Sequence, residues 1–540
     1  MSGSNPTAHT GGTGDTGHTA SLDVAALLTA LPSRIAEIPP RLAARDPQHV
    51  ALIEDARTVT NAQLADAVEA AAARLREYGV RAGDRVMIVA ENSVAQIVLL
   101  FATARLDAWA LVSNARLSAA ELDAIRAHAQ PRVMAFATDT SPDAAQHAQR
   151  LGAQAAFPFT TSPDIGMWSW VSDPAVEPEP VEADGNRQCA ALIYTTGTTG
   201  APKGVMLSHR NLLFIATVSS TLRRVSRDDV VYAVLPISHV YGLASVCLGS
   251  LHAGATLRLA PRFSPDAVRH ALAHERVSIF QGVPAMHAKL LDHLQANALP
   301  WSAPQLRFAY SGGSPLDAAL KARVERGYGV VLHNGYGMTE SSPTVAQTML
   351  DAPRADCSVG QAIPGIEVRF VAPGDGIDAA HAQDAPDGEV GELWVRGPNV
   401  MLGYYRNPEL THGTVTPDGW LKTGDLGRRD ADGALHIVGR SKELIIRSGF
   451  NVYPAEVEHV LNAHPDVVQS AVIGRAVEGN EEVIAFVELA SNARADIDAL
   501  HAWCRERLAP YKQPAQIRVL AALPAASTGK ILKHQLRAMV

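Results

Sequence analysis

Apolar residues recur at helical spacing and then in short unbroken runs over the first part of the chain. Four of them lie on one face of a predicted helix over 61–76: Leu64, Val68, Ala71 and Leu75. Asn61 can cap the start of this helix, and Gly79 lies just beyond its end. The runs RVMIVA, WALV and RVMAFA predict strands at 85–90, 109–112 and 132–137, with a helix near 118–129. Strands that alternate with helices indicate an α/β fold with parallel strands.

The pattern changes after a Gly- and Asp-rich segment at 373–390, where short strands separated by turns replace the alternation. From about residue 441 the pattern predicts a compact α+β unit, in which Pro454 suits the first turn of a helix. The expected elements of this unit are a helix, two strands and a second helix, at 454–464, 467–474, 482–489 and 494–508. We therefore place a domain boundary at Arg440–Glu443.

Composition and charge narrow the possible functions. The chain has 540 residues, a formal charge of −8, 47% hydrophobic and 19% charged residues, which suits more than one globular domain and excludes a mainly disordered chain. Mild acidity disfavours nucleic acid and anionic membranes as partners. The stretch 173–186 is acidic and proline-rich and is predicted to be a surface connection, while residues 1–22 predict a disordered tail.

Cysteine spacing indicates a reducing compartment, and hydropathy predicts no membrane span. The four cysteines lie far apart and form no CxxC pair, so neither a disulfide framework nor a zinc cluster is expected. No apolar run reaches the roughly 18–20 residues that a membrane-spanning helix needs. We expect a cytoplasmic protein without an integral membrane span, present as a monomer or homodimer.

Glycines and threonines gather around one lysine directly after the apolar run AALI. The segment is YTTGTTGAPKG, residues 194–204. Small residues let successive backbone N–H groups converge on a phosphate, the threonine hydroxyls add donors, and Lys203 adds positive charge. The common nucleotide loop GxxxxGK[ST] does not fit, because Pro202 and Lys203 stand where its Gly and Lys would be. The segment predicts a phosphate-binding loop of another kind.

This segment resembles the phosphate loop of the adenylate-forming enzymes, which include acyl-CoA synthetases, firefly-type luciferases and peptide-synthetase adenylation domains. Six further motifs agree with that family in the expected order: PISHVYG, YSGGSPL, NGYGMTES, GWLKTGDLG, GRSKELIIRSGFNVYPAEVE and STGKILK. The resemblance implies a large N-terminal AMP-binding domain with αβαβα-type sheet layers and a small β-barrel-like part, followed by a small mobile α+β domain. The implied limits are 23–439 and 444–540, joined by a hinge at 440–443.

The resemblance also implies two half-reactions. A carboxylate attacks the α-phosphate of Mg²⁺·ATP to give acyl-AMP and pyrophosphate, and a thiol, usually that of coenzyme A, then displaces AMP. ATP, Mg²⁺ and coenzyme A are the implied cofactors, and a carboxylic acid is the implied substrate. Joining two anions requires charge neutralisation more than acid–base chemistry.

Site residues carry over from the matching motifs. Lys530 resembles the adenylation lysine, Thr339 the phosphate-contacting threonine, and Glu340 the Mg²⁺ ligand. Tyr336 resembles the residue against adenine, Asp425 the acceptor of both ribose hydroxyls, and Arg440 a ribose or phosphate contact. Lys442 resembles the hinge residue, and Gly449 the glycine that lets the pantetheine thiol pass. The remaining nucleotide-binding residues implied are Thr195, Thr196, Gly197, Thr198, Thr199, Gly200, Lys203, Asn334, Gly335 and Gly337.

The implied acyl pocket comprises His239, Tyr241, Ser245, Tyr310, Gly312, Gly313, Gly337 and Thr344. PISHVYGLAS lacks an acidic residue that would hold an amino group, and the arginine of malonate-type enzymes is absent before YGMTE. Gly337 replaces the tryptophan of acetate-type enzymes, which predicts a long apolar slot. His239, Tyr241 and Ser245 match the 4-coumarate-type ligases, whereas Tyr310 is bulkier and Thr344 more polar. The pocket predicts a medium-sized aromatic or aliphatic monocarboxylic acid, with His239 as a gate to the thiol channel.

Three alternatives stay open from the residues alone. The acyl-AMP could be passed to a carrier protein rather than to coenzyme A. An acyl-serine hydrolase is suggested by SxxK at 527–530 and KTG at 422–424, although their order is reversed and SDN is absent. The third alternative is a nucleotide-binding module without catalysis. His270 and His274 lack the glutamate of HExxH, which disfavours a metalloprotease site.

Overall fold

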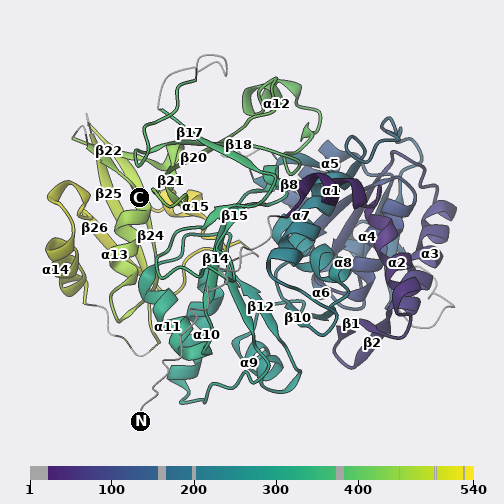
Figure 1. Cartoon of the computed structure of the whole chain (residues 1–540), viewed down its shortest axis with the longest axis horizontal. Coiled ribbons are helices and arrows are strands. Elements are labelled where there is room, and N and C mark those ends of the chain that lie inside the picture. The colour runs from purple at the N-terminus through teal and green to yellow at the C-terminus, as the bar shows by residue number, and fades with distance from the viewer. Residues whose placement is uncertain are drawn as a thin grey trace, which may run out of the picture.

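The computed structural model describes residues 22–155, 166–196, 202–372, 382–448, 450–478, 480–491, 493, 496–526 and 529–540. Two large sheets that mix parallel and antiparallel strands, with helices between and outside them, form most of the first 440 residues (Figure 1). This arrangement agrees with the expected αβαβα layers. The predicted domain limits and the hinge at 440–443 remain predictions.

The first sheet has eight strands in the order β19-β9-β8-β4-β3-β5-β7-β6. Its strands are β3 (Arg85–Ala90), β4 (Trp109–Asn114), β5 (Val133–Phe136), β6 (Gln154–Ala155), β7 (Ser169–Ser172), β8 (Cys189–Thr196), β9 (Pro202–Ser208) and β19 (Gly403–Tyr404). Strands β3, β4 and β5 pair in parallel, as predicted. The run RVMIVA forms β3 with the predicted limits because all six of its residues are buried.

The second sheet has nine strands in the order β16-β15-β14-β13-β12-β10-β11-β1-β2. Its strands are β1 (Val50–Glu54), β2 (Arg57–Thr60), β10 (Val230–Ala233), β11 (Thr256–Leu259), β12 (Ile279–Gly282), β13 (Phe308–Ser311), β14 (Leu332–Gly337), β15 (Thr344–Gln347) and β16 (Gln361–Ala362). A four-stranded antiparallel sheet follows where the β-barrel-like part was expected: β17 (Glu367–Val371), β18 (Gly391–Arg396), β20 (Leu421–Arg429) and β21 (Leu435–Arg440).

Helices of the first 440 residues fall into an inner and an outer set. The inner helices contact the facing sheets and are largely buried: α4 (Val94–Arg105), α7 (His209–Leu222) and α8 (Gly249–Ala253), with the π-helix η2 (Tyr241–Leu248). The others are α1 (Val24–Ala30), η1 (Ile35–Glu37), α2 (Ile38–Arg45), α3 (Asn61–Glu77), α5 (Ala119–Ala129), α6 (Pro142–Arg150), α9 (Pro265–His274), α10 (Pro284–Ala296), α11 (Ala318–Tyr328), η3 (Thr339–Ser341) and α12 (Pro408–Thr414).

The cap of α3 differs from the sequence prediction. The Thr60 hydroxyl accepts a hydrogen bond from the Gln63 backbone N–H at 3.3 Å, and the Gln63 side chain accepts one from the Thr60 N–H at 2.9 Å. Thr60, not Asn61, is therefore the cap. Asn61 is the first helical residue, and its amide donates to the Asp46 carbonyl at 2.8 Å. The stretch 173–186 contains no helix or strand, as predicted.

The C-terminal residues form a smaller α+β unit beside α10 and α11 (Figure 1). Its elements are η5 (Ser441–Glu443), β22 (Ile445–Arg447), β23 (Phe450–Val452), α13 (Pro454–Asn462), β24 (Val467–Val477), β25 (Asn480–Leu489), α14 (Ile497–Arg507), η6 (Pro510–Lys512), β26 (Gln516–Leu520) and α15 (Lys533–Arg537). Two contacts join this unit to α10. The Ser491 hydroxyl donates to Asp292 at 2.9 Å, and Glu488 pairs with Lys289 at 3.7 Å. None of the helices described is both long and apolar enough to cross a membrane.

One buried amide joins the two large sheets. Asn92 follows β3 and is 3% exposed. Its Nδ2 donates to the carbonyl oxygens of Ala233 and Leu235, both at 3.0 Å, and its Oδ1 accepts from the Ile237 N–H at 2.9 Å. These three bonds tie the end of β3 to the segment that follows β10, and this segment leads to His239.

Replacement of Asn92 should destabilise the protein. In Asn92→Ala two backbone carbonyls and one N–H lose a buried partner, and we expect a loss of about 2–4 kcal/mol in the free energy of unfolding. The measurement is the urea midpoint by circular dichroism. Asn297→Ala, which removes only exposed contacts with His293 at the end of α10, is the control and should change the midpoint little. Equal midpoints for the two variants would contradict the proposed link.

Candidate active site

Two predicted site residues, Arg440 and Tyr336, contact the carboxylate of a third, Asp425. Asp425 of β20 stands directly opposite Arg440 of β21 in the antiparallel ladder, and their Oδ1 and Nε atoms are 3.0 Å apart. The Tyr336 hydroxyl of β14 donates to Oδ2 of the same carboxylate. Asp425 is 3% exposed, and its negative charge raises the pKa of Arg440 against the effect of burial. A carboxylate held this way presents a fixed pair of acceptor oxygens.

Lys530 projects from a tight turn in the C-terminal unit. The Gly529 N–H donates to the Ala526 carbonyl and the Ala526 N–H to the Lys530 carbonyl, both at 2.8 Å. Gly529 has a φ of +82°, and a Cβ there would lie 2.8 Å from Cγ2 of Val283, so the turn requires glycine. This turn places Lys530 against the N-terminal domain.

The charge environment of Lys530 comes from both domains. Its side chain keeps contact with solvent, yet the surrounding protein is dense enough that burial lowers its pKa, and Arg440 lowers it further. Asp425 and Glu443 act in the opposite direction. The structure thus brings Lys530 together with Asp425 and Arg440.

His239 lies close to this cation. Burial lowers the pKa of His239 to about 4, and the positive charge of Lys530 contributes. Its Nδ1 accepts a hydrogen bond from the Tyr241 N–H at 3.3 Å, so the neutral ring carries its proton on Nε2. The imidazole is therefore neutral near pH 7 and cannot serve there as a cation.

The predicted acyl-pocket residues lie together on η2, β13 and β15. Tyr241 and Ser245 belong to the π-helix η2, a rare conformation that is common at functional sites. The Tyr241 ring meets that of Tyr310 edge-on with centroids 6.1 Å apart, and a Cβ on Gly312 would press on both rings. Ser245 Oγ is 3.4 Å from Thr344 Oγ1. The buried Tyr241 hydroxyl has no hydrogen-bond partner among the described residues.

The structure adds two details of the pocket that the sequence did not indicate. A Cβ on Gly337 would overlap the Pro343 carbonyl, so close packing of the backbone requires glycine there, and the apolar slot remains a prediction. Tyr310 points its hydroxyl to Gly335 of β14, where a Cβ would overlap it. Sequence reasoning also missed Arg223, which is 1% exposed and has its guanidinium 4.4 Å from the centre of the Tyr310 ring.

Glu340 and Lys203 share one neighbour that the motifs did not indicate. The Tyr404 hydroxyl donates to Oε1 of Glu340 at 2.8 Å, and the Lys203 ammonium is 5.8 Å from the centre of the Tyr404 ring. Tyr404 belongs to β19, which pairs with β9, the strand that carries Lys203. Thr339, beside Glu340, is buried. The arrangement sets a carboxylate at the hydroxyl of Tyr404 and an ammonium near the ring of the same residue.

Part of the predicted phosphate loop lies outside the described residues. The flanking strands β8 and β9 form an antiparallel pair in which Tyr194 stands opposite Gly204 and Thr195 opposite Lys203. Lys442 is exposed in η5. The predicted site residues that the structure does not describe are Gly197, Thr198, Thr199, Gly200 and Gly449, together with the side chain of Thr196.

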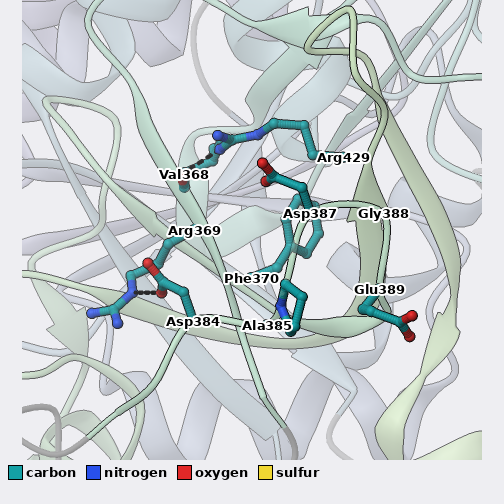
Figure 2. A pocket seen from close by; sticks show the side chains of 10 residues that line it. Val368, Arg369, Phe370, Asp384, Ala385, Asp387, Gly388, Glu389 and Arg429 are labelled. Carbon is teal, nitrogen blue, oxygen red and sulfur yellow. Dashed lines mark hydrogen bonds and ion pairs between the residues drawn. The ribbon is translucent and has the colours of Figure 1, made fainter.

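A small pocket elsewhere shares no residue with this site. It has a volume of about 90 Å³ and lies between β17 and the segment 384–389 (Figure 2). Arg369 pairs there with Asp384 at 2.7 Å, and Arg429 donates to the Val368 carbonyl. None of its lining residues belongs to the motifs.

Two family models and several known proteins match this chain. The family model of the AMP-binding enzyme matches residues 40–405, and that of the AMP-binding enzyme C-terminal domain matches residues 456–530. Feruloyl-CoA synthase of Amycolatopsis sp is 36% identical over 504 residues, covering 92% of this chain and 97% of its own. Indoleacetate–CoA ligase of Aromatoleum aromaticum is 34% identical over 509 residues, covering 93% and 97%. The structure of o-succinylbenzoate coenzyme A synthetase of Bacillus subtilis with ATP and magnesium ion superposes with a TM-score of 0.75 at 28% identity, covering 93% and 99%.

The proximity of Lys530 to His239 can be measured in solution. In Lys530→Met a positive charge leaves the neighbourhood of the imidazole, so the pKa of His239 should rise from about 4 while burial keeps it below 6.5. Selective ¹³C-histidine labelling and NMR titration follow this pKa, with His239→Gln to assign the signal. Lys512→Met, which changes a cation elsewhere in the C-terminal unit, should leave it unchanged. An unaltered pKa in Lys530→Met would show that the two groups lie apart.

Proposed function

The chain belongs to the AMP-binding enzyme family, and from this premise we propose how its own residues activate a carboxylic acid. It is an ATP-dependent, AMP-forming acid–CoA ligase, which uses Mg²⁺ and forms an acyl-AMP before the thioester. The observation that carries the residue assignment is the meeting of Lys530 from the C-terminal unit with Asp425 and Arg440 of the larger domain.

The first half-reaction joins two anions, and cations must offset their repulsion. Lys530 and Lys203 are proposed to stabilise charge on the acid carboxylate and the phosphates, while Asp425 accepts the ribose hydroxyls and Tyr336 lies against the base. Thr339 contacts the phosphates. Positioned charges of this kind act without reorganisation at the moment of reaction, which is where most of the rate enhancement arises.

The residues present suit Mg²⁺. No three His, Cys, Asp or Glu side chains among the described residues lie close enough to hold a metal by themselves. Mg²⁺ commonly binds one or two carboxylates and completes its shell with phosphate oxygens and water, so Glu340 alone fits this role. When bound, the ion would offset phosphate charge. Tyr404 holds Oε1 of Glu340 and would leave the second oxygen for the ion.

The second half-reaction requires the lysine to leave and the thiol to enter. We propose that the C-terminal domain turns about Lys442, which withdraws Lys530 and brings Gly449 to the thiol path. His239, neutral because of burial, is proposed to line that path, since a cation there would hold the acyl-AMP phosphate in place. Cytoplasmic location and a monomeric or homodimeric state remain predictions.

The substrate is proposed to be a medium-sized aromatic or aliphatic monocarboxylic acid. The two named CoA-forming relatives act on feruloyl and indoleacetate groups, as their names state. In this chain the pocket has aromatic walls from Tyr241 and Tyr310, and one polar pair, Ser245 with Thr344. The Tyr241 hydroxyl could serve an acid that carries a polar substituent. A carrier-protein arm in place of coenzyme A is the second candidate for the acyl acceptor.

The assay that tests the function measures pyrophosphate release with a panel of acids, with and without coenzyme A. Lys530→Ala should lose about 10²–10³-fold in acyl-AMP formation while it still converts supplied acyl-AMP to thioester. Gly449→Leu should do the reverse, because it obstructs the thiol. Equal loss of both steps in both variants, with the fold intact, would refute the two-pose mechanism. Thioester formation only with a carrier protein would establish the other acceptor.

The magnesium assignment generates a separate prediction. Tyr404→Phe removes the hydrogen bond that orients the Glu340 carboxylate, which should weaken Mg²⁺ binding. The Mg²⁺ concentration for half-maximal acyl-AMP formation should therefore rise about tenfold, while the rate at saturating Mg²⁺ changes little. Calorimetric binding of a non-hydrolysable ATP analogue should show the same shift. Tyr405→Phe is the matched control, since its hydroxyl donates to Glu179 instead. Equal Mg²⁺ dependence in both variants would remove Tyr404 from this role.

A further inference from the structure

A second lysine near the site has two carboxylate partners and no part in the proposed chemistry. Lys533 opens α15, three residues after Lys530. Its ammonium lies 3.1 Å from Oε2 of Glu443 and 2.9 Å from Oε1 of Glu458, and the three side chains are 19%, 28% and 13% exposed. Largely buried charges are stable only when they are paired, so each of these groups depends on the others.

The two carboxylates belong to different parts of the structure. Glu443 ends η5, the segment that is expected to be the hinge. Glu458 lies on α13, and its Oε1 also accepts from the Val472 N–H of β24 at 2.8 Å. Lys533 therefore connects the hinge segment to the body of the C-terminal unit. Although burial opposes both effects, the mutual attraction raises the pKa of Lys533 and lowers that of Glu443.

Backbone hydrogen bonds join the turn that carries Lys530 to the residues on either side of it. Backbone bonds from Ala526 and Gly529 close the turn on itself, and the Leu532 N–H donates to the Pro524 carbonyl at 2.8 Å. The next residue along the chain is Lys533. Because only two residues separate Lys530 from Lys533, the direction in which Lys530 leaves the turn depends in part on how firmly the start of α15 is held.

We propose that Lys533 is a positioning residue for acyl-AMP formation: by bridging Glu443 and Glu458 it holds the turn of Lys530 against the hinge segment. The inference rests on the proposed role of Lys530 and adds the element that keeps its ammonium in place. Glu443 also attracts Lys530 electrostatically, so the same carboxylate serves both lysines. A displacement of about 1 Å in a catalytic group can cost about a hundredfold in rate.

The test separates the two half-reactions in Lys533→Met, Lys533→Arg and the control Lys512→Met. Lys512 pairs with Glu456 at 2.6 Å in the same unit but outside this cluster. In Lys533→Met we expect kcat of acyl-AMP formation, measured by ATP–pyrophosphate exchange, to fall about 10- to 100-fold. The KM values for ATP and acid should change less than about threefold, and thioester formation from supplied acyl-AMP should stay within about twofold. Lys533→Arg should recover most of the loss, and Lys512→Met should behave as the wild type.

A further variant covers the case in which Lys533→Met does not fold. Glu458→Gln keeps an acceptor for Val472 and leaves Lys533 paired with Glu443, so it should fold and show a smaller loss confined to acyl-AMP formation. Wild-type exchange in Lys533→Met, or equal losses in both half-reactions in Glu458→Gln, would overturn the proposal. Failure of the wild-type protein itself to form acyl-AMP would instead refute the proposed function.

Discussion

The site depends on two cations that repel each other and are held together by two carboxylates. Arg440 lowers the pKa of Lys530, and Asp425 and Glu443 counter that effect. A polyanionic substrate meets cations that are already gathered, so little of its binding energy goes into assembling them. Because Lys530 comes from the C-terminal unit, this balance exists only while that unit sits against the larger domain. A change in the position of the C-terminal unit would therefore also change the charges in the site.

The fold supports that balance through a small number of buried polar contacts. Asn92 ties the two sheets at the point where the chain leaves β10 for His239. The π-helix that follows sets Tyr241 and Ser245 on the inner side of the second sheet. Tyr336 reaches Asp425 from a strand of that sheet, whereas Asp425 and Arg440 lie on neighbouring strands of the four-stranded one. The site thus forms where three sheets approach one another.

Local patterns predicted much of this and failed where partners lie far apart in the sequence. Local sequence was enough to find the strand at 85–90, because its residues form one unbroken apolar run. Short motifs were likewise enough to single out Tyr336, Asp425 and Arg440. The choice of Thr60 over Asn61 as cap depends on which side chain reaches the Gln63 N–H, which spacing alone does not reveal. Tyr404 escaped notice because its partner Glu340 is 64 residues away. At Gly337 the sequence reports a missing side chain but not the Pro343 carbonyl that fills its place.

Tyr310 lies between the proposed acyl wall and the strand that carries Tyr336. Its ring belongs to the proposed acyl wall, and its hydroxyl occupies space that a side chain at position 335 would need, on the strand that carries Tyr336. A lineage that enlarges the acyl wall by trimming residue 310 does not thereby free position 335, because the Ala346 carbonyl of the neighbouring strand still lies 2.7 Å from a Cβ there. Residue 310 can thus change with the acid while the glycine beside Tyr336 stays, so we expect acid preference and this stretch of backbone to evolve separately.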